Sequence, residues 1–511
     1  WSHYPRFFAS FMKTMYGHYA TRENDFAYHY LPKIERNYSW VHLFDDMYAG
    51  KLEGMTVFGM NPVANGPHSQ KMIAALSKLK WLVVAETFET ETAQFWRAPG
   101  VDPSKIDTEV FLLPAAIFAE KDGSFTNSAR WAQWKWKALD PPGEAKADQE
   151  ILARIFLQVR NLYENASGSF PEPILHLNWP YSEPQNPSLE EVAKEINGRA
   201  LTDLLNEKGE VVARAGEQLS GFLQLRDDGT TSSGNWIYCG SFTQEGNLMT
   251  RRGLKDPTGL GMYPEWTWSW PLNRRIMYNR ASCDARGRPW DPTRTAINWD
   301  GEKWVGDTPD YIANSPPEAG LGAFVMLPEG VGKLYAVDFV EGPFPEFYEP
   351  VESPVKNLLH PEASSNPLVK LFGSDMDKYG IPEEFPIVCT TYRLTEHFHY
   401  WTKHITVNSE LQPEFFVEIP EGLAQEMGIK NEEMVRVTSI RGSIQGKAMV
   451  TKRIRPMMVA GKKVWQIGIP IHWGFAGRVK GPLANFLTPT AIDPNCYTPE
   501  YKGFLVKLEK V

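Results

Sequence analysis

The chain has 511 residues, of which 42% are apolar and 23% are charged, and its formal net charge is -9. These proportions are typical of globular proteins and exclude a disordered, collagen-like or coiled-coil chain. The acidic balance argues against a nucleic-acid binder, which usually has a basic surface. No stretch approaches the roughly 18 apolar residues of a membrane-spanning helix. At about 150 residues per domain, this length predicts three or four domains.

Residues 1–165 are predicted to form an α/β segment. Short apolar runs alternate here with residues of helical spacing, such as residues 68–79. The runs are residues 55–60, 81–85 and 110–114. This alternation is typical of a parallel sheet covered on both faces. Residues 1–48 supply no leading strand–glycine–helix unit, so we expect the sheet to begin in a segment outside this sequence.

Residues 166–385 are dense in proline, glycine and tryptophan and show poor periodicity. Because segments so rich in aromatic residues rarely stay disordered, we expect an irregular, ordered insert that contacts other domains or a partner subunit. A helix is predicted over residues 188–206, where Ser188 can cap the first turn and Glu191 follows three residues later.

Residues 386–511 are predicted to form a β-barrel, because several short stretches have the composition of strands. These stretches are residues 415–419, 434–440, 443–454, 463–471 and 503–508. Arg441 and Gly442 predict a tight hairpin turn, and residues 420–428 a short helix that stops at Gly428.

The four cysteines lie far apart in sequence, at Cys239, Cys283, Cys389 and Cys496. Their spacing fits neither a disulfide scaffold nor a metal-binding motif. We therefore expect buried thiols.

Two polar side chains follow the first two predicted strands, Asn61 in the sequence GMNP and Glu86. In doubly wound sheets, ligands bind beyond the carboxyl ends of the strands. A carboxylate such as Glu86 can accept hydrogen bonds from a guanine base. The alternative is a strand-end turn beside a solvated acid.

Lys121 lies beside an Asp-Gly turn and could bind phosphate, whereas Asp148 could recognise a base edge. Asp148 also precedes a predicted helix over residues 150–163, where an acid favours the helix dipole. A purely structural capping role is the alternative.

Residues 390–402 (TTYRLTEHFHYWT) form a dense array of hydrogen-bond donors. In an extended segment His397 and His399 would share one face. Thr, Arg and neutral His donors suit a phosphate or pterin ligand. A metal site would need a third ligand, for which only His404 and His360 are within reach by sequence. A structural hydrogen-bond array is the remaining alternative.

The last segments singled out are residues 472–474, 485–488 and 499–502, which alone predict only turns and one exposed lysine. The sequence shows no nucleophile elbow, phosphate-binding loop, zinc-protease or kinase motif. We therefore expect no acid–base catalyst here and interpret the chain as one that holds a large ligand.

Taken in order, these segments resemble the catalytic subunit of bacterial formate dehydrogenases within the molybdopterin oxidoreductase (dimethyl sulfoxide reductase-like) family. The segments that carry the resemblance are GMNP, VVAETFETETA, EKDGSFTN, DPPGEAKADQE, TTYRLTEHFHYWTKH, PEFFVEIP, IPIHWG and ANFLTP. Residues 236–311 are similar to the insert of the respiratory or periplasmic formate dehydrogenases. The resemblance covers nearly the whole chain.

The resemblance implies a bis(molybdopterin guanine dinucleotide) cofactor carrying molybdenum or tungsten. It also implies a Rossmann-like segment over residues 1–165, an insert over 166–385 with subunit contacts, and a six-stranded barrel of double-psi type over 386–511. The resemblance implies the following cofactor-binding residues: Asn61, Ala85, Glu86, Lys121, Asp148, Thr391, Tyr392, Arg393, Leu394, Thr395, Glu396, His397, His399, Tyr400, Trp473, Asn485 and Lys502.

The family's catalytic residues match no position here. They comprise the selenocysteine or cysteine metal ligand, its neighbouring histidine, an arginine that orients formate, and the cysteines of a [4Fe-4S] cluster. We therefore expect this chain to be the C-terminal half of the subunit, without metal ligands or catalytic residues of its own.

The resemblance implies two-electron oxidation of formate to carbon dioxide in anaerobic respiratory electron transport. The expected partners are the N-terminal half, an iron–sulfur electron-transfer subunit and a membrane cytochrome b subunit, and the expected location is the periplasm. Two alternatives remain: a non-catalytic assembly module, in which the tryptophan-rich region docks an electron-transfer subunit, and a reductase of nitrate or another oxyanion.

Overall fold

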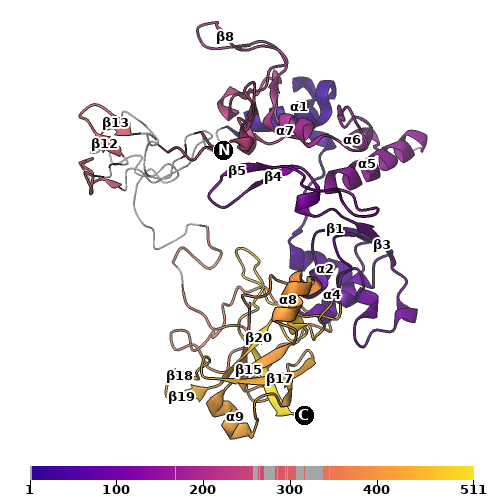
Figure 1. Ribbon diagram of the computed structural model, residues 1–511, viewed down its shortest axis with the longest axis vertical. Coiled ribbons are helices and arrows are strands. Elements are labelled where there is room, and N and C mark those ends of the chain that lie inside the picture. The colour runs from indigo at the N-terminus through magenta and orange to yellow at the C-terminus, as the bar shows by residue number, and fades with distance from the viewer. Residues whose placement is uncertain are drawn as a thin grey trace. The chain divides into compact units, whose positions relative to one another are not determined.

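The computed structural model divides the chain into two compact units (Figure 1). Unit 1 comprises Trp1–Lys33 and Ala116–Lys333, and unit 2 comprises Ile34–Ala115 and Leu334–Val511. The structure describes residues 3–166, 168–256, 263, 265–269, 282–284, 286–293, 295, 297–306, 316, 338–344 and 346–511. Part of the expected insert over residues 236–311 therefore lies outside the described residues.

Unit 2 contains a three-stranded parallel sheet in the order β1-β2-β3. The strands are β1 (Gly54–Phe58), β2 (Trp81–Glu86) and β3 (Glu109–Pro114). Each coincides with one of the predicted apolar runs, so the prediction of parallel strands is confirmed. The central strand β2 buries Leu82 and Val84 completely, because their side chains pack into the apolar core of unit 2.

Helices connect β1 to β2, as a parallel arrangement requires. The helices before and between these strands are α2 (Trp40–Tyr48), α3 (Pro62–Asn65) and α4 (Ser69–Leu76). Met72 and Leu76 of α4 and Phe44 of α2 have no exposed surface and belong to one apolar core with Leu82. The helical spacing of residues 68–79 therefore produced the predicted helix.

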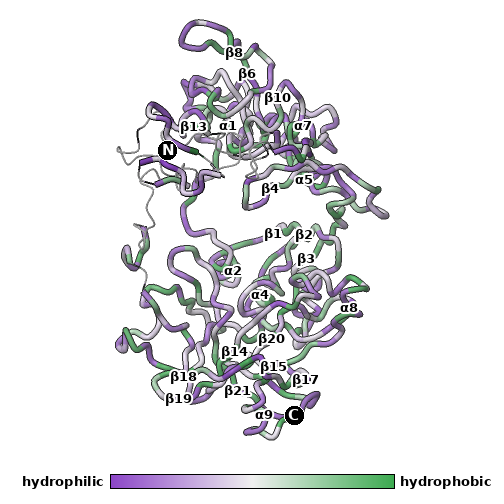
Figure 2. Tube along the Cα trace, turned by 60° about the vertical axis from the view of Figure 1, so that its left-hand side comes forward, coloured by the Kyte–Doolittle hydropathy of each residue, from purple (hydrophilic) through white to green (hydrophobic). Residues whose placement is uncertain are grey.

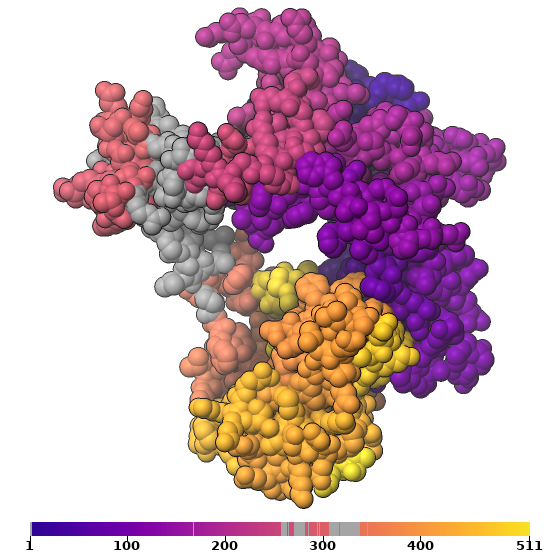
Figure 3. Space-filling model, viewed as in Figure 1, coloured from indigo at the N-terminus to yellow at the C-terminus, as the bar shows by residue number. Residues whose placement is uncertain are grey.

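A closed barrel of six strands forms the rest of the ordered core of unit 2, in the order β14-β20-β15-β17-β16-β21. Its strands are β14 (Ile387–Tyr392), β15 (Phe416–Pro420), β16 (Met434–Thr438), β17 (Ser443–Thr451), β20 (Gln466–Pro470) and β21 (Phe504–Lys510). Figure 3 shows the orange and yellow residues of this region as a continuous body. The predicted barrel is confirmed.

Alternation of buried and exposed residues explains why these segments are strands. Along β17 every second residue is buried, from Ile444 to Ala448, because successive side chains of a strand point to opposite faces. Figure 2 colours the chain by the hydropathy of its residues. The pairs β14–β20 and β15–β17 are parallel, whereas the other neighbours are antiparallel.

One predicted strand of this region needs adjustment, whereas the predicted turn and short helix are present. Residues 463–471 form two strands, β19 (Lys462–Val464), which pairs with β18 (Met457–Val459), and β20 of the barrel. The predicted hairpin turn is present, since Ser439 N donates to Gly442 O at 2.9 Å. The predicted short helix is α9 (Glu421–Met427), which ends at the left-handed Gly428 (φ 63°). Further short helices in this unit are η3 (Phe95–Arg97), η4 (Pro103–Lys105), η11 (Thr402–His404), α8 (Thr406–Leu411) and η12 (Ala484–Phe486).

Unit 1 is built from helices and short strand pairs. Its α-helices are α1 (Tyr4–Tyr16), α5 (Asp148–Asn165), α6 (Glu172–Leu175) and α7 (Leu189–Asn197). Its strands are β4 (Gly123–Thr126), β5 (Ala132–Lys135), β6 (Arg199–Ala200), β7 (Leu204–Leu205), β8 (Val211–Ala213), β9 (Thr231–Ser232), β10 (Phe242–Thr243), β11 (Gly246–Asn247), β12 (Ile297–Trp299) and β13 (Trp304–Gly306). Its 3-10 helices are η1 (Gly17–Tyr19), η2 (Arg22–Tyr30), η5 (Phe118–Glu120), η6 (Phe222–Gln224), η7 (Trp236–Tyr238) and η8 (Leu248–Thr250).

Helix α7 is shorter than the predicted helix over residues 188–206. It ends at Asn197 because Gly198 follows with φ 96°, a backbone conformation that favours glycine. A Cβ on Gly198 would lie 2.0 Å from the carbonyl oxygen of Ser232. The chain therefore turns here and continues directly into β6.

The predicted buried thiols are confirmed for Cys239, Cys283 and Cys389, whereas Cys496 is exposed. All four thiols are free. Among the described helices, none combines the length and the apolar composition needed to cross a membrane.

Candidate functional site

The carboxyl ends of β1 and β2 lie at the same edge of the sheet, because the two strands are parallel neighbours. Asn61 follows β1 and is fully buried. Its Nδ2 donates to Glu91 Oε2 at 2.7 Å, and its Oδ1 accepts from Thr92 N at 3.2 Å and from Thr92 Oγ1 at 2.9 Å. Its amide group therefore ties the loop after β1 to the loop after β2.

Glu86 ends β2 and is 4% exposed, next to the buried Ala85. Its Oε1 accepts from Thr87 N at 2.7 Å and from Thr87 Oγ1 at 3.1 Å. These two donors fix the direction of the carboxyl group at the strand end.

Glu91 and Lys403 form an ion pair that has no solvent-exposed side-chain surface. Besides Lys403 and Asn61, Glu91 accepts from Ala476 N at 3.0 Å. A Cβ on Gly474 would lie 2.0 Å from Glu91 Oε1, so only glycine fits beside the carboxylate. Burial lowers the pKa of Lys403, and the adjacent Glu91 opposes that effect.

This pair joins the loop after β2 to Lys403, the residue that directly follows the donor-rich segment of residues 390–402. Neither Glu91 nor Lys403 was among the predicted site residues. Each lies within or directly after a segment that carries the family resemblance, but 312 residues separate them. No local pattern indicates such a pairing.

The donor-rich segment is not extended throughout, so the condition under which His397 and His399 would share one face is not met. Thr391 and Tyr392 end β14, after which the chain leaves the barrel and His399 adopts φ 45°. His397 is buried, whereas Phe398 beside it is 63% exposed. The reversal at His399 turns its side chain away from the direction that an extended strand would give.

His397 is held by two hydrogen bonds. Its Nε2 lies 3.0 Å from Gln412 O and its Nδ1 3.0 Å from Thr402 Oγ1. A carbonyl oxygen only accepts, so Nε2 carries the proton. Thr402 Oγ1 accepts from Phe398 N at 2.8 Å and donates its proton to Nδ1. Both ring nitrogens are therefore occupied within the protein.

A second buried imidazole, His472, bridges the donor-rich segment. Leu394 N donates to its Nε2 at 2.8 Å, and its Nδ1 donates to His399 O at 2.7 Å. Burial is the main reason that the pKa of His472 falls to about 4, with further lowering by Arg393. The ring is therefore neutral and closes the loop between Leu394 and His399.

Two cations lie at the exposed side of this loop. Arg393 is exposed and has no hydrogen-bond or ion-pair partner among the described residues. Lys502 donates to Thr391 O. Burial and then the charge of Arg393 lower the pKa of Lys502. Two positive charges close enough to repel each other favour an anionic ligand.

A cavity of about 580 Å³ lies between the loop and the barrel strands β15 and β17. Arg393, Leu394, Thr395 and Glu396 line one part of it, and Phe416 and Lys447 line another. Tyr392 lies nearby, and its hydroxyl donates a hydrogen bond to Glu418 Oε2 at 2.7 Å. The same carboxylate forms an ion pair with Arg453. This pairing holds the base of the loop to the barrel.

The remaining predicted residues of unit 2 lie in the interior. Asn485 Nδ2 donates to Ala64 O at 2.8 Å and lies 3.5 Å from the hydroxyl of Tyr400. Burial raises the pKa of Tyr400 well above its usual range. Trp473 is fully buried, and its Nε1 has no hydrogen-bond partner within the described part of the chain. A buried indole N–H usually has a partner, so this group is open to an acceptor from outside the described residues.

Lys121 and Asp148 belong to unit 1, where they form an ion pair with each other. Asp148 is the first residue of α5, which agrees with its predicted position at the start of a helix. Lys121 also lines a cavity of about 400 Å³ together with Lys137 and Glu150. Within the described residues no group of three His, Cys, Asp or Glu side chains could hold a metal ion.

Two family models match the chain: "Molybdopterin oxidoreductase" over residues 33–157 and "Molydopterin dinucleotide binding domain" over residues 387–505. The second match coincides with the six-stranded barrel and its donor-rich loop. The first includes the parallel sheet of unit 2 and both Lys121 and Asp148.

The chain is similar over its full length to several curated proteins. It is 52% identical to the formate dehydrogenase-O major subunit and 51% identical to the nitrate-inducible formate dehydrogenase major subunit, both of Escherichia coli. It is 45% identical to a formate dehydrogenase major subunit of Haemophilus influenzae. All of this chain is covered in each comparison, and it spans 50% to 51% of these relatives. This chain therefore carries segments that match the molybdopterin oxidoreductase and molybdopterin dinucleotide-binding models, and it is homologous to formate dehydrogenase major subunits over about half of their length.

Proposed function

We propose that this chain is the part of a molybdenum- or tungsten-dependent formate dehydrogenase that holds a bis(molybdopterin guanine dinucleotide) cofactor. The single observation that carries the proposal is the 52% identity to the formate dehydrogenase-O major subunit across the whole chain. The structure adds a donor set that suits an anionic ligand with phosphate groups.

The residues present fit this cofactor on two grounds. Arg393 and Lys502 place two positive charges beside one loop, which suits phosphate oxygens. Trp473 Nε1 is a buried donor without a partner among the described residues, which suits an acceptor of the pterin. Thr395 and Glu396 line the cavity of about 580 Å³ together with Arg393. In this proposal they orient the ligand by hydrogen bonds.

Not every predicted residue contacts the cofactor through its side chain in this proposal. The side chains of Asn61, His397 and Asn485 are already bonded within the protein. We assign them the task of fixing the backbone of the loops that line the site. Glu86 would accept hydrogen bonds from the guanine base. In unit 1, Lys121 and Asp148 would become free to bind a nucleotide group once their ion pair opens.

The proposed reaction is the oxidation of formate to carbon dioxide with release of one proton and two electrons. When bound, the metal–pterin group supplies the acceptor for these electrons. This chain binds and orients the group, and its loops exclude water from the buried side. We place the metal ligand, the catalytic residues and the [4Fe-4S] cluster in the N-terminal half of the subunit.

We further propose that the sheet β1-β2-β3 is part of a Rossmann-like domain and that the barrel is of double-psi type. The sequential parallel order of the sheet and the mixture of parallel and antiparallel pairs in the barrel support these descriptions. The functional divisions at residues 1–165, 166–385 and 386–511 belong to the same proposal, as do an iron–sulfur subunit, a membrane cytochrome b subunit and a periplasmic location.

Replacement of Arg393 tests the cofactor proposal. The enzyme with Arg393→Ala is expected to contain severalfold less molybdenum or tungsten, and correspondingly less guanine nucleotide, than the wild type. Arg455→Ala is the matched control, because Arg455 is an exposed arginine of the same barrel region. Metal content is measured by elemental analysis and guanine by chromatography of the released cofactor. Unchanged occupancy in Arg393→Ala would refute the role assigned to Arg393.

A further inference from the structure

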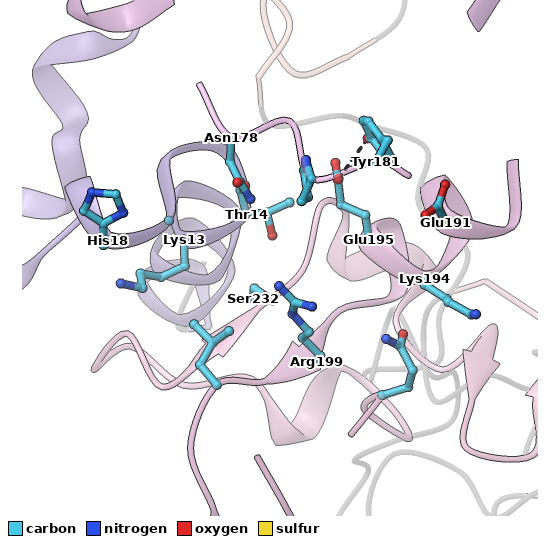
Figure 4. Close-up of a pocket in the computed structure, with 14 residues that line it drawn as sticks. Lys13, Thr14, His18, Asn178, Tyr181, Glu191, Lys194, Glu195, Arg199 and Ser232 are labelled. Carbon is cyan, nitrogen blue, oxygen red and sulfur yellow. Dashed lines mark hydrogen bonds between the residues drawn. The ribbon is translucent and has the colours of Figure 1, made fainter. Parts of the chain in front are cut away.

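Unit 1 contains a cavity of about 420 Å³ that none of the proposed cofactor-binding residues lines. It lies among α1, α7, β6, β9 and the segment of residues 178–181 (Figure 4). Its volume falls within the range of small-molecule sites in proteins. The cavity carries charges of both signs, from Lys13, Arg199 and Glu195 among others.

The floor of the cavity is a row of side chains on three adjacent backbone segments. Arg199 of β6 lies directly opposite Ser232 of β9 on one side and Gln218 on the other. Residues paired across neighbouring strands project from the same face, so all three point into the cavity. Arg199 has no hydrogen-bond or ion-pair partner among the described residues of its surroundings, and its guanidinium can therefore bind a carboxylate in a bidentate manner.

The opposite wall prefers a positive charge. Glu195 lies in the last turn of α7, where the helix dipole favours cations. The hydroxyl of Tyr181 donates to Glu195 Oε2 at 2.8 Å and fixes the direction of the carboxylate. Burial raises the pKa of Glu195, and Arg199 opposes that effect, so the two charges act on each other without forming a direct ion pair.

Both Arg199 and Glu195 line the cavity; Figure 4 shows the Glu195 carboxylate directed toward Tyr181 and the Arg199 guanidinium on another side, near Ser232. A ligand that carried only a negative charge would face the carboxylate of Glu195. A ligand that carried only a positive charge would face Arg199 and Lys13. A ligand with one charge of each sign satisfies both walls.

We propose that this cavity binds a small zwitterion of the amino-acid or dipeptide type, with its carboxylate on Arg199 and its ammonium group on Glu195. The cavity volume of about 420 Å³ accommodates a molecule of this size. The proposal concerns unit 1 alone and does not depend on the proposed cofactor function.

Three related probes test it on the intact protein. Glycylglycine carries both charges, N-acetylglycylglycine lacks the ammonium group, and glycylglycinamide lacks the carboxylate. In ligand-observed NMR titrations, glycylglycine should bind saturably, and each single-charge probe at least tenfold more weakly. Equal binding of all three probes, or no saturable binding of glycylglycine, would overturn the proposal.

Substitutions locate the binding. Arg199→Gln and Glu195→Gln should each weaken glycylglycine binding at least tenfold, whereas Arg214→Gln, at an exposed arginine near β8, should not. If circular dichroism shows that either cavity variant is misfolded, the titrations of the wild-type protein with the three probes decide whether the proposal holds. Undiminished binding by both well-folded cavity variants would show that the dipeptide binds elsewhere.

Discussion

Two lysine–carboxylate pairs lie in segments that carry the family resemblance, yet their surroundings differ completely. The side chains of Glu91 and Lys403 in unit 2 are both 0% exposed. Those of Lys121 and Asp148 in unit 1 are 19% and 48% exposed. The first pair has further buried partners in Asn61 and the amide of Ala476, whereas water can replace either partner of the second.

The comparison shows that burial, and not the residue types, decides what an ion pair can do. A buried pair cannot exchange its partner without leaving an uncompensated charge in the interior. Glu91 and Lys403 therefore fix the geometry of the loops around the barrel. An exposed pair contributes little stability and opens readily, so Lys121 and Asp148 remain available for a ligand.

The largest expected effect is that of breaking the buried pair. Lys403→Met should lower the free energy of unfolding by about 3–5 kcal/mol, because it leaves the charge of Glu91 buried and unpaired. The double variant Glu91→Gln/Lys403→Met should lose less than Lys403→Met alone. Urea denaturation measures both, with Lys121→Met as the matched exposed control. Equal losses for Lys403→Met and Lys121→Met would contradict the comparison.

An intermediate effect is expected from pH, since burial lowers the pKa of His404, beside Lys403, and of His472 to about 4. Histidine in the unfolded chain has a pKa near 6.5. Between about pH 6.5 and pH 4 the unfolded state therefore binds more protons, and stability falls as the pH falls.

The melting temperature should thus be nearly constant above pH 7 and decrease from pH 6.5 to pH 5. His472→Gln should be less stable at pH 7.5 but less sensitive to this change in pH. His29→Gln, at an exposed histidine, should keep the wild-type dependence. If the melting temperature of the His472→Gln variant falls with pH as steeply as that of the wild type, His472 does not contribute to the pH dependence of stability.

The smallest effect on stability is expected at the exposed pair. Asp148→Asn should change the free energy of unfolding by less than about 1 kcal/mol. Under the proposed function it should nevertheless reduce the guanine nucleotide content of the purified enzyme. A loss of stability as large as that of Lys403→Met would identify the pair as structural instead.

Sequence reasoning predicted the parts of the fold that depend on neighbouring residues. The apolar runs of β1, β2 and β3 and the alternation along β17 are local signals, and each produced the expected strand. The end of α7 was predicted several residues too late, although Gly198 is a local stop signal; its close approach to Ser232, a residue far away in sequence, gives no local signal.

The site was predictable only as a set of segments. The motifs indicated that residues 390–402 form a donor-rich segment, but not which donors the protein itself would use. His397 and His472 illustrate this limit: the backbone partners of both rings lie in the loop or adjacent segments. The reversal at His399 (φ 45°) also gives no sequence signal, since histidine is not a residue that marks left-handed turns strongly.

The two bonds of His472 also limit how this loop can change. The rigid ring spans a fixed distance between an amide hydrogen at Leu394 and a carbonyl oxygen at His399. An exposed side chain between these two residues, such as Phe398, can be exchanged because neither bond involves it, whereas the buried His397 has hydrogen bonds of its own. A single inserted or deleted residue, however, would leave one ring nitrogen without its partner. The loop therefore tolerates changes of composition far better than changes of length, and libraries that alter it should hold its length constant.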